Sequence, residues 1–221
     1  MKQVNFKSKD GLLITADYYK AENHKGFIVL CHRSHCNRAE YRETAPKFNQ
    51  LGYSCLAIDQ RSGMKVFGEE NETKNRAKEQ KLPTGYLDAR PDIESAIDYA
   101  FDLNGKNKII LLGSSYSSAL ALLISTNSDK VKSVIAFSPN EHLKKVDLAK
   151  EIASIDVSIF ATSAKKEIKQ VTEVLRFVDE KHITHFKPEV EGFHGSKTIW
   201  EVVEGYETCW KELEEFLVKT E

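Results

Sequence analysis

The chain has 221 residues, of which 41% are hydrophobic and 29% are charged, and its formal net charge at pH 7 is −1. This composition is typical of a globular domain and excludes a disordered or fibrous chain. Because 32 basic side chains face 33 acidic ones, no overall field attracts nucleic acid or an anionic membrane, and we expect neither as a partner.

The predicted elements begin with two short strand-like runs, residues 4–7 and 12–19, that flank Ser8-Lys9-Asp10-Gly11. Asp-Gly between such runs predicts a β-hairpin. Further along, apolar runs that suit strands buried on both faces alternate with helical patterns. The predicted strands are residues 26–31, 53–58, 108–112, 131–137, 157–162 and 184–190. The predicted helices are residues 39–51, 88–103, 115–125, 143–152, 167–180 and 195–218.

This alternation predicts an α/β fold: a mostly parallel central sheet with helices on both faces, plus the antiparallel N-terminal hairpin. Residues 60–85 are polar and irregular, and we expect a solvated loop with a short helix there. A mobile flap over a site is the alternative for this stretch. No repeat, low-complexity tract or linker divides the chain, so we expect one domain over residues 1–221 without a separate cap domain.

The cysteines and the apolar runs indicate which cellular compartment to expect for the protein. The four cysteines include no C-x-x-C pair, which disfavours a zinc ribbon or thioredoxin chemistry and favours a reduced, cytoplasmic protein. The N-terminus has no apolar segment of the kind found in signal peptides. The longest apolar run, residues 119–124, is too short to span a bilayer.

The sharpest motif is the turn Gly113-Ser114-Ser115-Tyr116-Ser117 between a predicted strand and a predicted helix. It matches the nucleophile elbow G-x-S-x-G, with serine in place of the last glycine. Small residues suit such a tight turn, which raises the central serine above the sheet. We therefore predict Ser115 as the nucleophile rather than Ser114. A helix-capping serine in a plain loop is the alternative interpretation.

A serine nucleophile needs a base, and folds with this motif place the residues in the order serine, acid, histidine. Among His142, His182, His185 and His194, only His194 lies in a glycine-flanked loop between the last predicted strand and the last helix. Glycines let a ring project from such a loop. We predict His194 as the general base.

The acid should follow the preceding parallel strand, and Glu167 is the first carboxylate after residues 157–162. We predict Glu167 as the acid. A carboxylate that only complements the helix dipole would have the same position. Glu141, after the earlier strand, and Asp156, at the opposite end of the strand, are the rivals.

The oxyanion hole should combine the N–H of Tyr116 with one from the loop after the strand at residues 26–31. In that loop the Ser34 N–H is the first choice and the Arg33 N–H the second. The Arg33 and His35 side chains are candidates for contact with a polar or anionic substrate group. A metal site at His32, His35 and Cys36 is disfavoured because no second ligand cluster accompanies it, so we expect no metal and no cofactor.

With these residues identified, the sequence resembles the α/β-hydrolase superfamily, and within it the compact dienelactone-hydrolase-like branch. The resemblance covers nearly the whole chain. It rests on residues 29–41 (VLCHRSHCNRAEY), residues 56–63 (LAIDQRSG), the elbow at residues 113–117, and Phe193-His194-Gly195. It implies the fold and a hydrolytic activity, but fold analogy does not name a substrate.

Four features depart from that family. His35 and Ser117 replace glycines, the acid is a glutamate in Ser-Ala-Lys-Lys-Glu, and the nucleophile is serine where dienelactone hydrolases use cysteine. We expect a serine hydrolase that cleaves a small-molecule ester or thioester through a Ser-His-Glu triad and an acyl-enzyme. A catalytically weak or inactive binding protein on the same fold is the alternative. Peptidase or acyltransferase chemistry would use the same residues, and the oligomeric state is left open.

Overall fold

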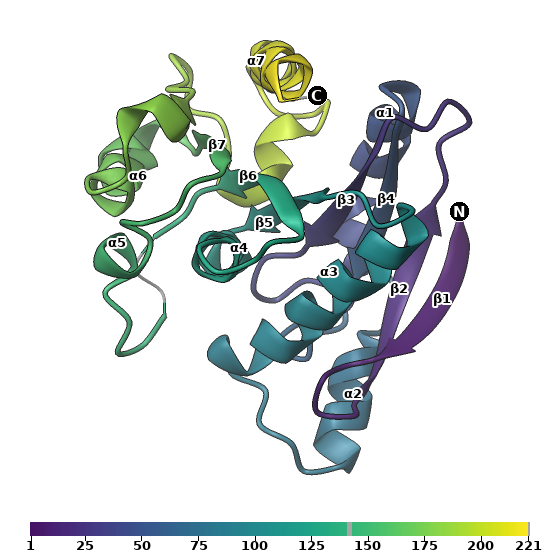
Figure 1. Cartoon of the computed structure of the whole chain (residues 1–221). Helices are drawn as coiled ribbons and strands as arrows, with labels where there is room; N and C mark the ends of the chain where they lie inside the picture. Colours follow the sequence, from purple (N-terminus) through teal and green to yellow (C-terminus); the bar gives the residue numbers. More distant parts are fainter. Residues whose placement is uncertain (141–142, 221) are drawn as a thin grey trace. The chain divides into compact units, whose positions relative to one another are not determined.

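The computed structural model describes residues 1–140 and 143–220 (Figure 1). Its contacts group the chain into two compact units, Met1–Leu111 and Leu112–Glu221. Each unit is described by itself. The expectation of one domain without a cap stays a prediction.

The first unit is built on four strands. Strand β1 (Lys2–Lys7) pairs antiparallel with β2 (Leu13–Tyr19), and β2 pairs antiparallel with β4 (Tyr53–Ile58). Strand β3 (Gly26–Cys31) pairs parallel with β4. Every residue of β3 and β4 is buried, as their continuous apolar runs predict. The predicted N-terminal hairpin is confirmed.

The first unit has three α-helices, which are α1 (Thr44–Gln50), α2 (Glu72–Glu79) and α3 (Arg90–Leu103). The prediction of one helix over residues 39–51 was wrong, because a 3₁₀ turn η1 (Arg38–Tyr41) precedes α1. Pro46 explains the break: it has no N–H for a carbonyl one turn earlier, so it is tolerated only in a first helical turn. Helix α2, preceded by the Asn71 cap, confirms the short helix expected within residues 60–85. A second 3₁₀ turn, η2 (Leu87–Ala89), leads into α3.

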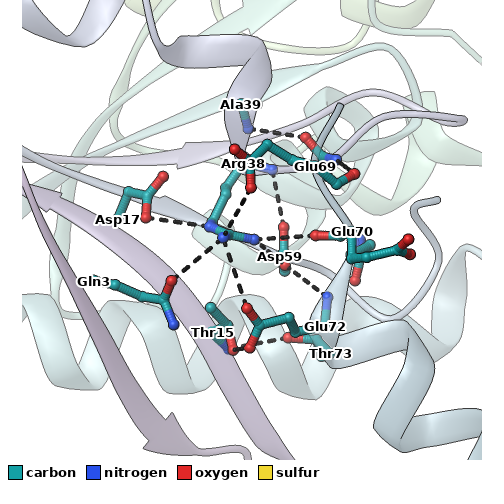
Figure 2. Close-up of polar contacts among 12 residues, drawn as sticks. Gln3, Thr15, Asp17, Arg38, Ala39, Asp59, Glu69, Glu70, Glu72 and Thr73 are labelled. Atoms are coloured by element: carbon teal, nitrogen blue, oxygen red, sulfur yellow. Dashed lines mark hydrogen bonds and ion pairs between the residues drawn. The ribbon is translucent and has the colours of Figure 1, made fainter. Parts of the chain in front are cut away.

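A buried arginine holds the end of the loop that follows β3. The Arg38 guanidinium donates to Asp17 at 3.2 Å and to Asp59 at 2.7 Å, and the Arg38 N–H donates to the other Asp59 oxygen at 3.0 Å (Figure 2). Asp59 also accepts from the N–H of Glu72, the first residue of α2. The carboxylate thus connects the loop after β3 to the start of α2.

The second unit contains β6 (Val131–Phe137), β7 (Ser158–Thr162) and β8 (Ile183–His185), with β6–β7 and β7–β8 both parallel. Strand β5 (Ile109–Ser114) runs across the boundary between the units. The helices are α4 (Tyr116–Ser125), α5 (Leu148–Glu151), α6 (Ile168–Leu175) and α7 (Tyr206–Lys219). The described part of this unit also has the 3₁₀ turns η3 (Lys165–Glu167), η4 (Glu180–His182) and η5 (Gly195–Ile199).

Several predicted lengths in the second unit were wrong. Strand β8 has three residues, and α5 and α6 are shorter than predicted. The predicted helix over residues 195–218 is instead η5 followed by α7, because Trp200 is extended and Gly205 has a left-handed φ of 81°. A Cβ at position 205 would come 2.5 Å from Val190 Cγ2, so glycine is needed there.

The predicted fold class is confirmed: parallel strand pairs, flanking helices and an antiparallel N-terminal hairpin are all present. No helix within residues 1–140 and 143–220 is both long and apolar enough to cross a bilayer.

Candidate active site

Ser115 occupies a strained turn between β5 and α4. Its backbone has φ 59° and ψ −123°, which non-glycine residues rarely adopt and which costs of the order of 1–3 kcal/mol. The turn is tight because a Cβ at Gly113 would lie 2.4 Å from both the Ser117 carbonyl oxygen and the Ser118 Cα. Residues Tyr116–Ser125, which form α4, are all buried and fix the helix after the turn.

Ser117, at the position where the elbow motif has its last glycine, closes this turn with its side chain. The Ser114 N–H donates to Ser117 Oγ at 2.8 Å, and Ser117 Oγ donates to the Ser114 carbonyl at 2.9 Å. The departure from the glycine motif therefore adds two hydrogen bonds and leaves the geometry of a strand–turn–helix elbow in place.

His194 lies in the loop between β8 and η5. Its Nε2 is 2.8 Å from Ser115 Oγ, and its Nδ1 is 2.7 Å from Glu167 Oε1. A carboxylate only accepts hydrogen bonds, so Nδ1 carries the proton and Nε2 is left to accept from the Ser115 hydroxyl. This tautomer is the one that a base acting on Ser115 requires.

Glu167 ends the short turn η3 after β7, and its two oxygens have different partners. Oε1 contacts His194, whereas Oε2 accepts from Ser138 Oγ at 2.8 Å and from the Ala164 N–H at 3.3 Å. Burial raises the pKa of Glu167, but the hydrogen bonds from His194 and Ser138 outweigh burial, so this pKa lies below its usual range. The carboxylate is ionised at neutral pH.

The rival residues lie elsewhere. Ser114 is fully buried, and its Oγ accepts from the Ser196 N–H at 2.9 Å. Asp156 is exposed and precedes β7, at the opposite end from Glu167. Glu141 and His142 lie outside the described residues.

The remaining predicted residues have different surroundings. Tyr116 is the first residue of α4, directly after Ser115. Ser34, Arg33 and His35 belong to the first unit, in the loop after β3, and their predicted roles stay predictions. The Arg33 N–H, the second choice as oxyanion donor, is engaged by Glu40 Oε2 at 2.8 Å. In the described part of the chain, no group of three or more histidines, cysteines or carboxylates is arranged to hold a metal ion.

Ser138 is a contact of Glu167 that the sequence did not reveal. It follows β6 directly, with a left-handed φ of 52°. The sequence feature that could have identified Ser138 is its place at the carboxyl end of a predicted parallel strand. That strand precedes the one after which the acid was predicted.

The family profile described as serine aminopeptidase, S33 matches residues 22–220, which is most of the chain. The chain belongs to the serine aminopeptidase S33 family. The α/β-hydrolase resemblance found in the sequence is thereby confirmed, and this serine aminopeptidase S33 member is an enzyme of the hydrolase class.

Solved structures similar to this S33 family member share its fold at low identity. The Pyrococcus furiosus esterase Pf2001 has a TM-score of 0.76 at 16% identity, over 99% of this chain and 92% of that one. Est1E from Butyrivibrio proteoclasticus has a TM-score of 0.73 at 11% identity, over 100% and 99%. A dienelactone hydrolase from Anabaena variabilis has a TM-score of 0.70 at 13% identity, over 100% and 99%. No curated protein matches the sequence.

Proposed function

We propose that the protein is a serine hydrolase that cleaves a small-molecule ester or thioester through Ser115, His194 and Glu167. The observation that carries the proposal is the continuous hydrogen-bond chain from Ser115 Oγ through the His194 ring to Glu167. A serine hydroxyl is a weak nucleophile until a base within hydrogen-bond distance can take its proton. Esterases among the solved structures of the same fold support an ester as the substrate.

In the proposed reaction, Ser115 Oγ attacks the carbonyl carbon while His194 Nε2 takes the hydroxyl proton. Glu167 stabilises the imidazolium that forms. His194 then protonates the leaving alcohol or thiol, which departs and leaves an acyl ester on Ser115. A water molecule, deprotonated by His194, attacks this ester and releases the acid and free Ser115.

The developing oxyanion needs donors. The N-terminus of α4, where Tyr116 stands, carries the positive end of the helix dipole and supports negative charge next to Ser115. The Ser34 N–H is the second donor predicted from the sequence. No step of this reaction calls for a cofactor.

The proposed substrate and setting are consistent with charge and cysteine use. A net charge of −1 gives no field that would attract nucleic acid, and the esterases of the same fold support a small-molecule ester as the partner. The four cysteines are free and buried, which supports a reduced, cytoplasmic setting.

The test is labelling with a fluorophosphonate probe, read by intact mass and by tandem mass spectrometry of the modified peptide. We expect one adduct on the wild type, on Ser115 rather than Ser114, and none on Ser115→Ala. A folded wild type without an adduct, or an adduct that survives Ser115→Ala, contradicts the proposal. Ser128→Ala, at a partly exposed serine after α4, is the matched control and should label like the wild type.

The family description favours a second candidate, hydrolysis of an N-terminal peptide bond. The same acyl-enzyme serves both reactions, so labelling alone does not separate them. Parallel assays with p-nitrophenyl acetate and with amino-acid p-nitroanilides do. Turnover of the ester with none of the anilides supports the esterase, and the reverse result supports the aminopeptidase.

A further inference from the structure

The 3₁₀ turn η5 follows His194 and has no side-chain cap from it. The first N–H groups of a helical turn have no partner within it, and the side chain of the preceding residue commonly accepts one of them. His194 holds that preceding position but makes no capping bond, because both ring nitrogens are engaged with Ser115 and Glu167. These buried N–H groups need acceptors from elsewhere in the chain.

Two serine hydroxyls from other strands supply them. The Gly195 N–H donates to Ser138 Oγ at 2.9 Å, and the Ser196 N–H donates to Ser114 Oγ at 2.9 Å. Ser138 lies just after β6, and Ser114 is the last residue of β5. The backbone directly after His194 is therefore fixed to two strand ends.

Ser138 also has a second bond, to Glu167. Its hydroxyl accepts from Gly195 and donates its single proton to Glu167 Oε2 at 2.8 Å. One buried hydroxyl thus joins the carboxylate that would orient the base to the backbone that carries the base. Ser138 is 2% exposed, so water does not readily replace it.

The backbone of Ser138 makes the choice of serine informative. A φ of 52° favours glycine, and a non-glycine residue there pays a conformational cost. The Ser138 N–H donates to the Thr162 carbonyl, a bond that does not depend on the side chain. Serine occupies this position despite that cost, and its hydroxyl supplies the contacts to Gly195 and Glu167.

We propose that Ser138 is a positioning residue, whose hydroxyl holds Glu167 and the His194 loop in the relative position that the reaction at Ser115 requires. The inference rests on the proposed function, because it requires Glu167 and His194 to act together. Ser138 does not touch the reacting atoms, and it acts through the two residues that do.

The test compares steady-state kinetics and melting temperature for Ser138→Gly and Ser138→Thr with p-nitrophenyl acetate. Glycine relieves the backbone but leaves the Gly195 N–H without the Ser138 hydroxyl, and these effects on stability oppose each other. We therefore expect a small change in Tm, kcat lower by about tenfold or more, and KM within about twofold. Threonine keeps the hydroxyl at a strained backbone, so we expect a lower Tm and a kcat closer to the wild type. Ser133→Ala is the matched control, since this buried β6 hydroxyl has no hydrogen-bond partner among the residues that the structure describes.

The outcomes separate the two proposals. If Ser115→Ala is inactive and Ser138→Gly keeps the wild-type kcat, the positioning role is overturned and the proposed function stands. If Ser115→Ala keeps the wild-type activity, the proposed function fails first. A Ser138→Gly variant that loses kcat and Tm together, in parallel with Ser133→Ala, also overturns the positioning role. If Ser138→Thr does not fold, the comparison of Ser138→Gly with Ser133→Ala decides.

Discussion

The Nε2 atom of His194 lies 2.8 Å from the Oγ of Ser115, although 79 residues separate them along the chain. The strained elbow presents the hydroxyl, and the loop after β8 brings the ring to it. Both residues belong to the unit formed by residues 112–221, and so does Glu167.

Replacing the proposed base should nearly abolish turnover. We expect His194→Ala to lower kcat for p-nitrophenyl acetate by about 10⁴-fold or more, because the Ser115 proton then has no acceptor. His182→Ala, at a partly exposed residue of the turn η4, is the control and should keep wild-type kinetics. A His194→Ala variant that keeps a tenth of the wild-type kcat would remove His194 from the mechanism.

Changing Glu167 to its amide tests the histidine tautomer. In Glu167→Gln, the amide can donate to Nδ1 and stabilise the tautomer with its proton on Nε2, which cannot accept from Ser115. We expect kcat to fall by about 10³- to 10⁴-fold with little change in the free energy of unfolding. Glu173→Gln, an exposed carboxylate on α6, should have no effect on kcat. Equal activity of the two variants would contradict the role of Glu167.

A buried ion pair in the first unit should dominate the stability of its loops. The Arg61 side chain is 2% exposed and donates to the fully buried Asp92 at 2.6 Å. Arg61→Met leaves this carboxylate unpaired, so we expect the free energy of unfolding to fall by about 3–5 kcal/mol in urea titrations. Arg90→Met breaks the more exposed pair with Glu94 and should cost less than about 1 kcal/mol. Similar losses for both variants would argue against this difference in burial.

His185 should make the protein sensitive to mild acid. Burial, assisted by the nearby Lys187 charge, lowers the pKa of His185 to about 4, below the 6.5 of an unperturbed ring. Between these values the unfolded chain binds a proton that the folded chain does not, so stability is full above pH 6.5 and falls as the pH drops toward 4. The loss between pH 7 and pH 5 is at most about 2 kcal/mol, because solvent reaches part of the ring.

Urea titrations of the wild type and His185→Leu at pH 7 and pH 5 measure this contribution. We expect the wild type to lose more stability than His185→Leu over this interval. His182→Leu, which removes the histidine directly before β8, is the matched control. An equal pH dependence of the wild type and His185→Leu would exclude His185 as its source.

The sequence predicted those parts of the molecule that depend on local patterns. Buried strands such as β3 and β4 were readable because their apolar runs are continuous, and the elbow was readable because Gly113 admits no side chain. The broken helix at residues 195–218 was missed, because the extended backbone at Trp200 depends on tertiary contacts. One of these is the bond from Trp210 Nε1 to the Ile199 carbonyl.

In the candidate site too, residues that belong to a sequence pattern were predicted, and a residue defined by its distant contacts was missed. Ser115, Glu167 and His194 were named because each follows a predicted strand in the order that the elbow motif implies. Ser138 was not named, because a lone serine after a strand has no motif and its significance lies in partners 29 and 57 residues away.

The four buried thiols have a practical consequence for labelling. Burial raises the pKa of Cys36 and of Cys209 to about 12, and it also raises the pKa values of Cys31 and Cys55. Thiols with such pKa values carry almost no thiolate at neutral pH, and thiolate is the form that reacts with maleimides and peroxide. A single cysteine introduced on an exposed helix would therefore accept a fluorophore selectively in the native protein, without removal of the four natural thiols.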